Sequence, residues 1–392
     1  MYRATDGILL PTTITGSLPR PRWYTENLGG RGFLEAMALA DFREQYMDAL
    51  STFLREQEVA GLDICTDGDC RFDNDVGGQS WAGYVTRHLS GYDFTHPHSP
   101  PRRAQFPNGS ILADNAATRV LPRIVGPIGR GELQYANLWK AAQRQTVKPV
   151  KFGTAAAEVV AMAADDQFYK SLDERMFAIA AALHAELEEL AELGCAALQI
   201  EEPQVHMLAA RAPKDRAFPI ETAIEVFNAT VKGLRGKTEI WAHTCWGNPS
   251  QQRMYAAVQS YAPGLALLNR LDCDIITFES VSSGGIDLEA IGREIAPDKK
   301  IGIGVIDHHT LQVERPEEVA AHIRLALKHI PVERLVISTD CGMGREGMSR
   351  RHAFFKMVAL VQGTNIVRRE LGLPVAECRA EDERYVFSAP AR

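Results

Sequence analysis

Eight short apolar segments recur along the chain, and each one stops abruptly in polar residues or glycine. They cover residues 12–17, 61–69, 148–154, 196–203, 239–245, 273–280, 301–307 and 334–342. Between them, apolar residues at three- and four-residue spacing predict amphipathic helices, for example over 33–61 and 174–194. Strands that alternate with helices pair in parallel, because each helix carries the chain back across the sheet. Eight such repeats predict an α/β fold of the (β/α)8 TIM barrel type, as one catalytic domain over residues 1–392.

The connection between the second and third predicted strands is longer than the others. Residues from about 70 to 147 are rich in proline, glycine, histidine and aromatic residues, and they end in a helical pattern. We therefore expect an insertion over the barrel mouth, with a hairpin and a helix. Residues from about 376 to 392 follow the last helical pattern and predict a C-terminal appendage, which is a candidate for contacts in an oligomer.

Charge and cysteine content exclude several classes of protein. The formal net charge is −7 and the sequence pI is about 5.9, without a run of lysine or arginine, so we expect no nucleic acid and no membrane surface as partner. The seven cysteines have no regular spacing, which indicates a reducing compartment rather than a disulfide framework. The sequence has no signal-peptide core and no run long enough to span a membrane, so the expected location is the cytoplasm.

Four potential metal ligands stand at the ends of predicted strands. His243 and Cys245 end the fifth strand, Glu279 ends the sixth, and Cys341 ends the eighth. The C-terminal ends of barrel strands surround one shared cavity, and residues two apart on a strand point to the same face. One imidazole, two thiolates and one carboxylate are typical ligands of tetrahedral zinc. The sequence therefore predicts that these four residues bind Zn2+.

This set of ligands also indicates what the zinc does. Two thiolates make the ion softer and favour a substrate thiol that binds as a thiolate. A free thiol with a pKa of about 8.5 is mostly protonated at neutral pH, and zinc removes this proton while the sulfur stays nucleophilic. The predicted function is that of a zinc-dependent thiol S-alkyltransferase. The alternative from another class is a non-catalytic zinc-storage or thiol-binding protein, which requires four permanent protein ligands.

Several motifs resemble those of a known family. The motifs HTC, FES and TDCG follow one another in this order, after PTTITGSLPRP near the start and LQIEEP in the middle of the chain. Together they resemble the C-terminal catalytic half of cobalamin-independent methionine synthases, in a short core form without the N-terminal half. The resemblance implies methyl transfer to homocysteine, which forms methionine, with methyltetrahydrofolate or methylcobalamin as the donor. The implied partners are thus a small-molecule thiol and an alkyl donor.

The resemblance also implies roles for individual residues. The residues that match the zinc ligands of the family are His243, Cys245, Glu279 and Cys341. The serine and the two carboxylates that hold the amino acid portion of homocysteine match Ser17, Asp69 and Glu201. The catalytic histidine near the leaving group matches His309, and Asp307 lies beside it in VIDHHT.

Two positions depart from the family pattern in ways that concern the substrates. The two homocysteine carboxylates are usually Glu and then Asp, whereas this chain has Asp69 and then Glu201. The exchanged lengths imply a shifted position for the ammonium group of the substrate. The tryptophan that stacks on the folate pterin falls near Ala155, where the chain has no aromatic residue. The missing aromatic residue weakens the case for methyltetrahydrofolate as the methyl donor.

The segment GSLPRPRWY provides an alternative function. It carries Arg20 and Arg22, and it is similar to a Pro-Arg-Trp-Tyr segment of a neighbouring branch, the epoxyalkane:coenzyme M transferases. Coenzyme M carries a sulfonate, which Arg20 is placed to bind, so the alternative reaction is the addition of such a thiol to an epoxide. Solvation of both arginines at the surface is the competing explanation. The uroporphyrinogen decarboxylases, which need no metal, are an alternative at the level of the fold.

Overall fold

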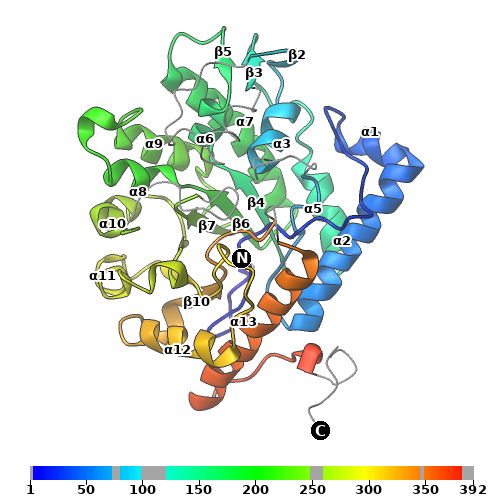
Figure 1. Cartoon of the computed structure of the whole chain (residues 1–392). Helices are drawn as coiled ribbons and strands as arrows, with labels where there is room; N and C mark the ends of the chain where they lie inside the picture. The colour runs from blue at the N-terminus through cyan, green and yellow to red at the C-terminus, as the bar shows by residue number, and fades with distance from the viewer. Residues whose placement is uncertain (1–2, 73–79, 99–120, 248–258, 345–347, 382–392) are drawn as a thin grey trace, which may run out of the picture.

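A parallel sheet of seven strands forms the centre of the molecule (Figure 1). The computed structural model describes residues 3–72, 80–98, 121–247, 259–344 and 348–381. Neighbouring strands all pair in parallel, in the order β1-β4-β6-β7-β8-β9-β10. The strands are β1 (Cys65–Thr66), β4 (Val150–Ala155), β6 (Ala197–Glu201), β7 (Glu239–Thr244), β8 (Ile275–Phe278), β9 (Lys300–Gly304) and β10 (Leu335–Ser338). Seven of the eight predicted strands are therefore confirmed, although β1 is much shorter than predicted.

The remaining predicted strand, residues 12–17, forms only an isolated bridge between Thr12 and Ile337. Its backbone nevertheless contacts both edges of the sheet. Thr13 donates its N–H to the carbonyl of Ile337 in β10 at 3.0 Å, and the carbonyl of Thr12 accepts the N–H of Asp63, just before β1, at 3.1 Å. The ladder stays irregular because the Asp63 carboxylate accepts both the N–H and the hydroxyl of Thr12, each at 2.8 Å. The prediction of a regular strand here was wrong.

Helices surround the sheet on its outer side (Figure 1). They are α1 (Phe33–Ala38), α2 (Ala40–Ala60), α5 (Tyr135–Gln143), α6 (Ala157–Met162), α7 (Leu172–Glu192), α8 (Gln204–Ala209), α9 (Ile220–Thr230), α10 (Leu265–Leu268), α11 (Leu288–Glu294), α12 (Pro316–Leu327) and α13 (Arg350–Glu370). The predicted helix over 33–61 is interrupted at Leu39, whose backbone is extended. α2 ends at Gly61 with a φ of 94°, where a Cβ would lie 2.6 Å from the Glu377 carbonyl oxygen, so only glycine fits. Among the described residues, no helix has the length and apolarity needed to cross a membrane.

The connection between β1 and β4 forms a small second sheet. It contains the helix α3 (Ser80–His88) and the antiparallel strands β2 (Tyr92–His98) and β3 (Leu121–Ile124). A short strand from beyond β4, β5 (Asp165–Asp166), pairs in parallel with β3. A helix and an antiparallel pair therefore occur where they were expected, while residues 73–79 and 99–120 lie outside the described part. The predicted appendage is described only up to residue 381, with a short 3-10 helix at Arg379–Glu381.

The register of the sheet brings polar side chains together at one edge. Glu201 at the end of β6 pairs with Ala155 of β4 on one side and with His243 of β7 on the other. His243 pairs in turn with Thr277 of β8. Paired residues of neighbouring parallel strands point to the same face, so these side chains form one row at the C-terminal ends of the strands. The candidate site is built around this row.

Candidate metal and substrate site

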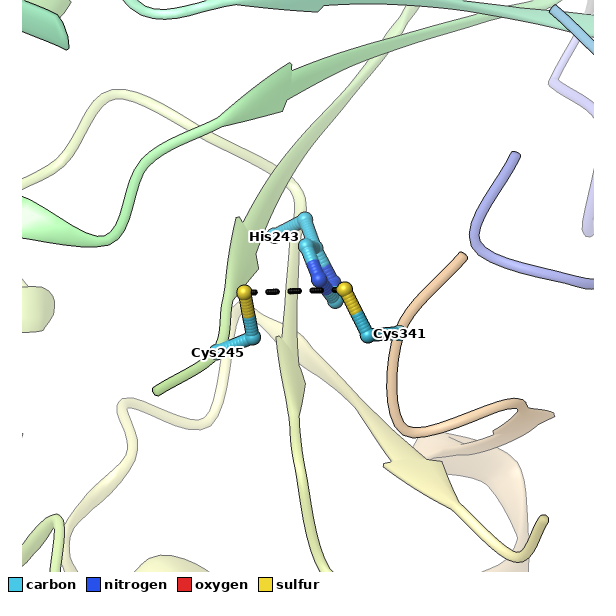
Figure 2. Close-up of side chains that lie close together, drawn as sticks. All are labelled: His243, Cys245 and Cys341. Atoms are coloured by element: carbon cyan, nitrogen blue, oxygen red, sulfur yellow. Dashed lines mark hydrogen bonds between the residues drawn. The ribbon is translucent and has the colours of Figure 1, made fainter. Parts of the chain in front are cut away.

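Three of the four predicted zinc ligands lie together at this edge of the sheet (Figure 2). His243 belongs to β7, Cys245 follows that strand directly, and Cys341 follows β10. Their ligand atoms all lie within 4.8 Å of one another, and the two sulfur atoms are 3.7 Å apart. All three residues are buried. The fold thus brings together two segments that are about a hundred positions apart in the sequence.

Neighbouring side chains orient the imidazole of His243. Its Nδ1 is hydrogen-bonded to the hydroxyl of Thr277 at 2.7 Å. Its Nε2 has no hydrogen-bond partner among the described residues and lies 3.6 Å from Oε2 of Glu201. A hydrogen bond at one ring nitrogen commonly orients the other nitrogen toward a metal. Thr277 is not among the site residues predicted from the sequence. It stands two residues before Glu279 and therefore faces the same side of the sheet, which was the available signal.

The thiols and the imidazole influence the ionisation of one another. Contact with Cys341, followed by burial, raises the pKa of the Cys245 thiol well above its ordinary value, and Glu279 and Glu201 add to the effect. Burial opposes the imidazolium form of His243, but Glu201 and Cys341 outweigh it and raise the pKa of His243. Without a cation, the surroundings therefore favour the forms of Cys245 and His243 that keep their protons. A metal ion between the sulfur atoms would displace them and balance the negative charge.

The geometry and the donor atoms of these residues fit zinc. At a Zn–S length of about 2.3 Å and a tetrahedral angle, two zinc-bound sulfur atoms are roughly 3.8 Å apart. The separation of the Cys245 and Cys341 sulfur atoms is 3.7 Å. His243 Nε2 supplies a third donor atom that is otherwise unpartnered among the described residues. Thiolate and imidazole ligands suit zinc, whereas magnesium and calcium prefer oxygen.

The fourth predicted ligand, Glu279, lies beside this group rather than within it. Its Oε2 accepts the backbone N–H of Trp246 at 2.9 Å, and its Oε1 accepts the hydroxyl of Ser282 at 2.9 Å. Oε1 is also 3.7 Å from Nε2 of His309. Burial raises the pKa of Glu279. The carboxylate therefore lies next to both the thiols and the predicted catalytic histidine, and its role as a metal ligand stays a prediction.

The predicted catalytic pair, His309 and Asp307, is hydrogen-bonded in the loop after β9. Asp307 Oδ1 lies 2.9 Å from His309 Nδ1 and accepts the His309 backbone N–H at 2.7 Å. Burial lowers the pKa of His309, but the hydrogen bond to Asp307 and the charge of Glu279 more than reverse this, so the net change is upward. The buried Lys356 holds the loop, since its Nζ donates to the Asp307 carbonyl at 3.0 Å and to the Glu314 carboxylate at 2.9 Å.

Ser17 packs against the loop that carries Cys341. Its hydroxyl accepts the N–H of Gly344 at 3.2 Å. A Cβ at Gly342 would collide with the same hydroxyl, so glycine is required for this close approach. On the other side, a Cβ at Gly16 would lie 3.0 Å from Oδ2 of Asp69. Ser17 thus contacts the loop that carries Cys341, while its neighbour Gly16 approaches Asp69, and the substrate-binding role of Ser17 stays a prediction.

A buried arginine holds Asp69 in place. Nη1 of Arg71 lies 3.1 Å from Asp69 Oδ1 and 3.2 Å from Asp67 Oδ2. The φ of Asp69 is 51°, and this left-handed conformation is supported by Asp67, which accepts the Asp69 N–H at 2.9 Å. Burial raises the pKa of Asp69 to about 7, with Arg71 opposing the shift and Asp67 and Glu201 adding to it. Arg71 is not among the site residues predicted from the sequence. An arginine so close to the end of a buried strand was the available signal.

Glu201 connects the predicted substrate residues with the thiol group. Its Oε1 accepts the side-chain amide of Gln199 at 2.6 Å, and its Oε2 faces Nε2 of His243 at 3.6 Å. Burial raises the pKa of Glu201, and His243 opposes the shift. The side chains of Glu201 and Asp69 are 23% and 14% exposed, so both are open to a small ligand. The carboxylate of Glu201 therefore lies directly beside the three candidate metal ligands, and the charge of Asp69 is close to that of Glu201.

Arg20, the residue predicted to bind a sulfonate, is engaged within its own segment. Its guanidinium donates to the backbone carbonyls of Tyr24 at 2.7 Å and Phe72 at 2.8 Å, and also to that of Glu26. The same group lies over the Tyr24 ring, 3.5 Å from its centroid. These contacts hold the polypeptide after the predicted first strand. The geometry therefore favours a structural role for Arg20 over the predicted contact with a substrate anion.

The chain is similar in sequence to one of the families that its motifs indicate. Residues 10–362 match the family model described as cobalamin-independent synthase, catalytic domain. The chain belongs to the cobalamin-independent methionine synthase family. The resemblance found in the motifs is therefore confirmed, and the protein is an enzyme. The zinc-storage and decarboxylase alternatives are not supported.

Individual members of the cobalamin-independent methionine synthase family match along nearly their whole length. A methionine synthase from Saccharolobus solfataricus is 28% identical over 368 residues, which cover 93% of this chain and 96% of the relative. A B12-independent methionine synthase from Shewanella sp. W3-18-1, solved with selenomethionine, has a TM-score of 0.73 and 27% identity and covers 93% of this chain and 99% of its own. A putative vitamin-B12-independent methionine synthase from Listeria monocytogenes, with a TM-score of 0.64, 18% identity and coverage of 90% and 96%, supports the fold. These relatives do not favour the epoxyalkane:coenzyme M transferase branch.

Proposed function

We propose that this protein is a zinc-dependent thiol methyltransferase that transfers a methyl group to homocysteine and forms methionine. The observation that carries the proposal is the contact between the two halves of the site. Oε2 of Glu201, one of the two predicted substrate carboxylates, lies 3.6 Å from Nε2 of His243, in the group that would bind zinc. A thiol bound to this group would place the rest of its molecule beside Glu201 and Asp69, whose carboxylates suit an ammonium group. The selenomethionine complex of the Shewanella relative also supports an amino acid ligand.

The proposal extends to the fold of the whole chain. We infer a (β/α)8 TIM barrel in which residues 12–17 occupy the position between β10 and β1, as the hydrogen bonds of Thr12 and Thr13 support. It forms a single domain over residues 1–392, with an insertion over about 70–147 between the second and third strands and an appendage over about 376–392. All seven cysteines lie in the described part of the chain and form no disulfide with one another, which supports a reducing compartment such as the cytoplasm.

The residues of the site divide into metal ligands and substrate-binding residues. His243, Cys245 and Cys341 would hold zinc. Glu279, which lies beside them and accepts the backbone N–H of Trp246, is the proposed fourth ligand. When bound, zinc would lower the pKa of the substrate thiol, so that the sulfur is nucleophilic at neutral pH. Asp69 and Glu201 attract the ammonium group of homocysteine, and Ser17 donates its hydroxyl to the substrate carboxylate. Together they fix the sulfur relative to the methyl donor, and such positioning supplies a large part of the rate.

His309 serves the other half of the reaction, in which the methyl donor loses its methyl group. A leaving nitrogen of a folate or a comparable leaving group requires a proton. Asp307 is hydrogen-bonded to Nδ1 of His309, so the imidazolium is stabilised and its Nε2 is available to donate. The donor is methyltetrahydrofolate or methylcobalamin. Ala155, which is buried at the end of β4, offers no ring for a pterin to stack on, and this weakens the folate assignment.

An assay of thiol consumption tests this proposal. Zinc-loaded protein is offered homocysteine or coenzyme M, each with methylcobalamin, methyltetrahydrofolate or epoxypropane. We expect methionine from homocysteine with at least one of the two methyl donors, and no consumption of coenzyme M with epoxypropane. The absence of methionine with both methyl donors would overturn the proposal. Consumption of coenzyme M by the epoxide would instead establish the alternative reaction.

The raised pKa of Asp69 predicts how activity depends on pH. Only the carboxylate form attracts an ammonium group, and the pKa of Asp69 in the free protein is raised to about 7, so the neutral form prevails below that pH. We therefore expect kcat/KM for homocysteine to fall about tenfold for each pH unit below about 7. The measurement is a pH profile with the zinc content determined at each point. Asp69→Asn, which cannot ionise, should have a low kcat/KM without this acidic limb, and a limb unchanged in that variant would contradict the assignment.

A further inference from the structure

A lysine side chain is buried inside the sheet, close to the carboxylate of Glu201. Lys151 belongs to β4 and is 1% exposed. Its Nζ donates to Oε1 of Gln199 at 2.5 Å and to the carbonyl of Ile14 at 2.9 Å. The same atom lies 4.4 Å from the centroid of the Trp241 ring. A charged group in such a place needs compensation, and none of the steps described above uses it.

The contact with Lys151 determines how the amide of Gln199 is oriented. Nζ of Lys151 donates to the amide oxygen of Gln199, so this oxygen faces the lysine. The amide nitrogen then points the other way and donates to Oε1 of Glu201 at 2.6 Å and to the carbonyl of Thr15 at 2.7 Å. A continuous chain of hydrogen bonds therefore runs from Lys151 through Gln199 to Glu201. Each of its members lies on β4 or β6, which are neighbouring strands.

This chain fixes the one carboxylate that contacts both halves of the site. With Oε1 bound to Gln199, the second oxygen of Glu201 faces His243 at 3.6 Å. A glutamate side chain has three torsions, and hydrogen bonds must restrict them if the carboxylate is to hold a ligand. Without the donor at residue 151, only the Thr15 carbonyl and the Glu201 carboxylate restrain the Gln199 amide, so its orientation is less tightly fixed. Burial lowers the pKa of Lys151 to about 7, and the nearby carboxylates of Glu201 and Asp69 oppose this shift.

We propose that Lys151 is a positioning residue that acts through Gln199 to hold Glu201 ready for the ammonium group of the thiol substrate. The inference rests on the proposed function, because it takes an amino acid thiol as the ligand. It predicts a selective defect, since only ligands with an ammonium group use Glu201. A purely structural lysine would affect all thiols equally or none. Lys299 offers the comparison, since it is also buried and its Nζ donates to the carbonyls of Leu271 and Cys273, each at 2.8 Å.

The test is calorimetric titration of the zinc-loaded protein with two thiols. Homocysteine is compared with 4-mercaptobutyrate, which has the same thiol and carboxylate but no ammonium group. We expect Lys151→Met to raise the Kd of homocysteine about tenfold or more, as for the loss of a hydrogen bond to a charged group, and to leave the Kd of 4-mercaptobutyrate unchanged. The matched control Lys299→Met should lower the melting temperature without changing either Kd. In a Glu201→Gln background, Lys151→Met should have little further effect.

Several outcomes would overturn the inference. Equal weakening of both thiols by Lys151→Met, or unchanged binding of homocysteine, excludes the positioning role while the proposed function stands. Absence of homocysteine binding to the wild type would instead overturn the proposed function, and this inference with it. If Lys151→Met does not fold, Gln199→Met breaks the same chain while Lys151 is kept. That variant should show the same selective loss of homocysteine, and equal Kd values for wild type and Gln199→Met would also exclude the inference.

Discussion

Replacing Cys341 by serine is expected to remove zinc and activity together. Cys341 supplies one of the two sulfur atoms that lie 3.7 Å apart, and a hydroxyl is a poor substitute for a thiolate as a zinc ligand. A catalytic metal contributes several kcal/mol to the transition state, so methionine formation should fall on the order of a thousandfold. The measurements are the zinc content of the purified variant and the rate of methionine formation. His243→Ala should behave in the same way.

Cys195→Ser provides the matched control for this experiment. Cys195 is also buried, but its sulfur contacts the carbonyl of Ala197 at 3.4 Å at the opposite end of β6. This variant should retain zinc and activity, with at most a lower melting temperature. If Cys341→Ser binds a full equivalent of zinc and turns over at the wild-type rate, the assignment of the metal site is wrong.

Replacing His309 by alanine is expected to abolish turnover while zinc stays bound. His309 Nε2 lies 3.7 Å from Glu279 Oε1, whereas the candidate metal ligands that lie together are His243, Cys245 and Cys341. Loss of a general acid commonly costs about a hundred- to ten-thousandfold in rate. The fall should appear in kcat, and the zinc content and the Kd of homocysteine should stay at their wild-type values. Rapid-mixing kinetics and metal analysis check both parts of the prediction.

Two further variants make this second prediction sharper. Asp307→Asn keeps a hydrogen-bonding partner for His309 but removes the charge that stabilises the imidazolium, so its rate should lie between wild type and His309→Ala. His352→Ala removes a histidine near the start of α13, whose ring contacts Ser349, and should leave turnover unchanged. A normal kcat for His309→Ala would show that another group supplies the proton.

Periodicity predicted most of the fold because each strand and helix carries its own apolar pattern. The seven strands from β1 to β10 and the long helices α2, α7 and α13 were all found close to their expected positions. Residues 12–17 have the same apolar pattern, but the Asp63 carboxylate accepts the N–H of Thr12 and prevents a regular ladder. The contact joins residues about fifty positions apart, and no local pattern contains it. The spacing of apolar residues also does not predict the interruption of the helix at Leu39.

It was also predictable that the site residues lie close together, since the strand ends of one barrel meet in one place. The contacts that orient the ligands were not. Thr277 was recognisable from its spacing to Glu279, but Arg71 and Lys151 depend on what surrounds them after folding. Arg20 illustrates the opposite error, in which a structural residue was predicted to bind substrate. An arginine beside a strand end is a plausible anion-binding residue in the sequence, but in the structure backbone carbonyls accept its hydrogen bonds.

By itself, the sequence determined the alternation of strands and helices and the family to which the chain belongs, and it identified His243, Cys245 and Cys341 as candidate metal ligands. These properties are carried by residue types and local spacing, which are independent of the rest of the molecule. Only the tertiary structure decided that Glu279 lies beside the thiols rather than among them, and that a chain of hydrogen bonds joins Lys151 to Glu201. Hydrogen bonds and ion pairs depend on distances of a few ångströms between distant segments, and only the folded chain sets those distances.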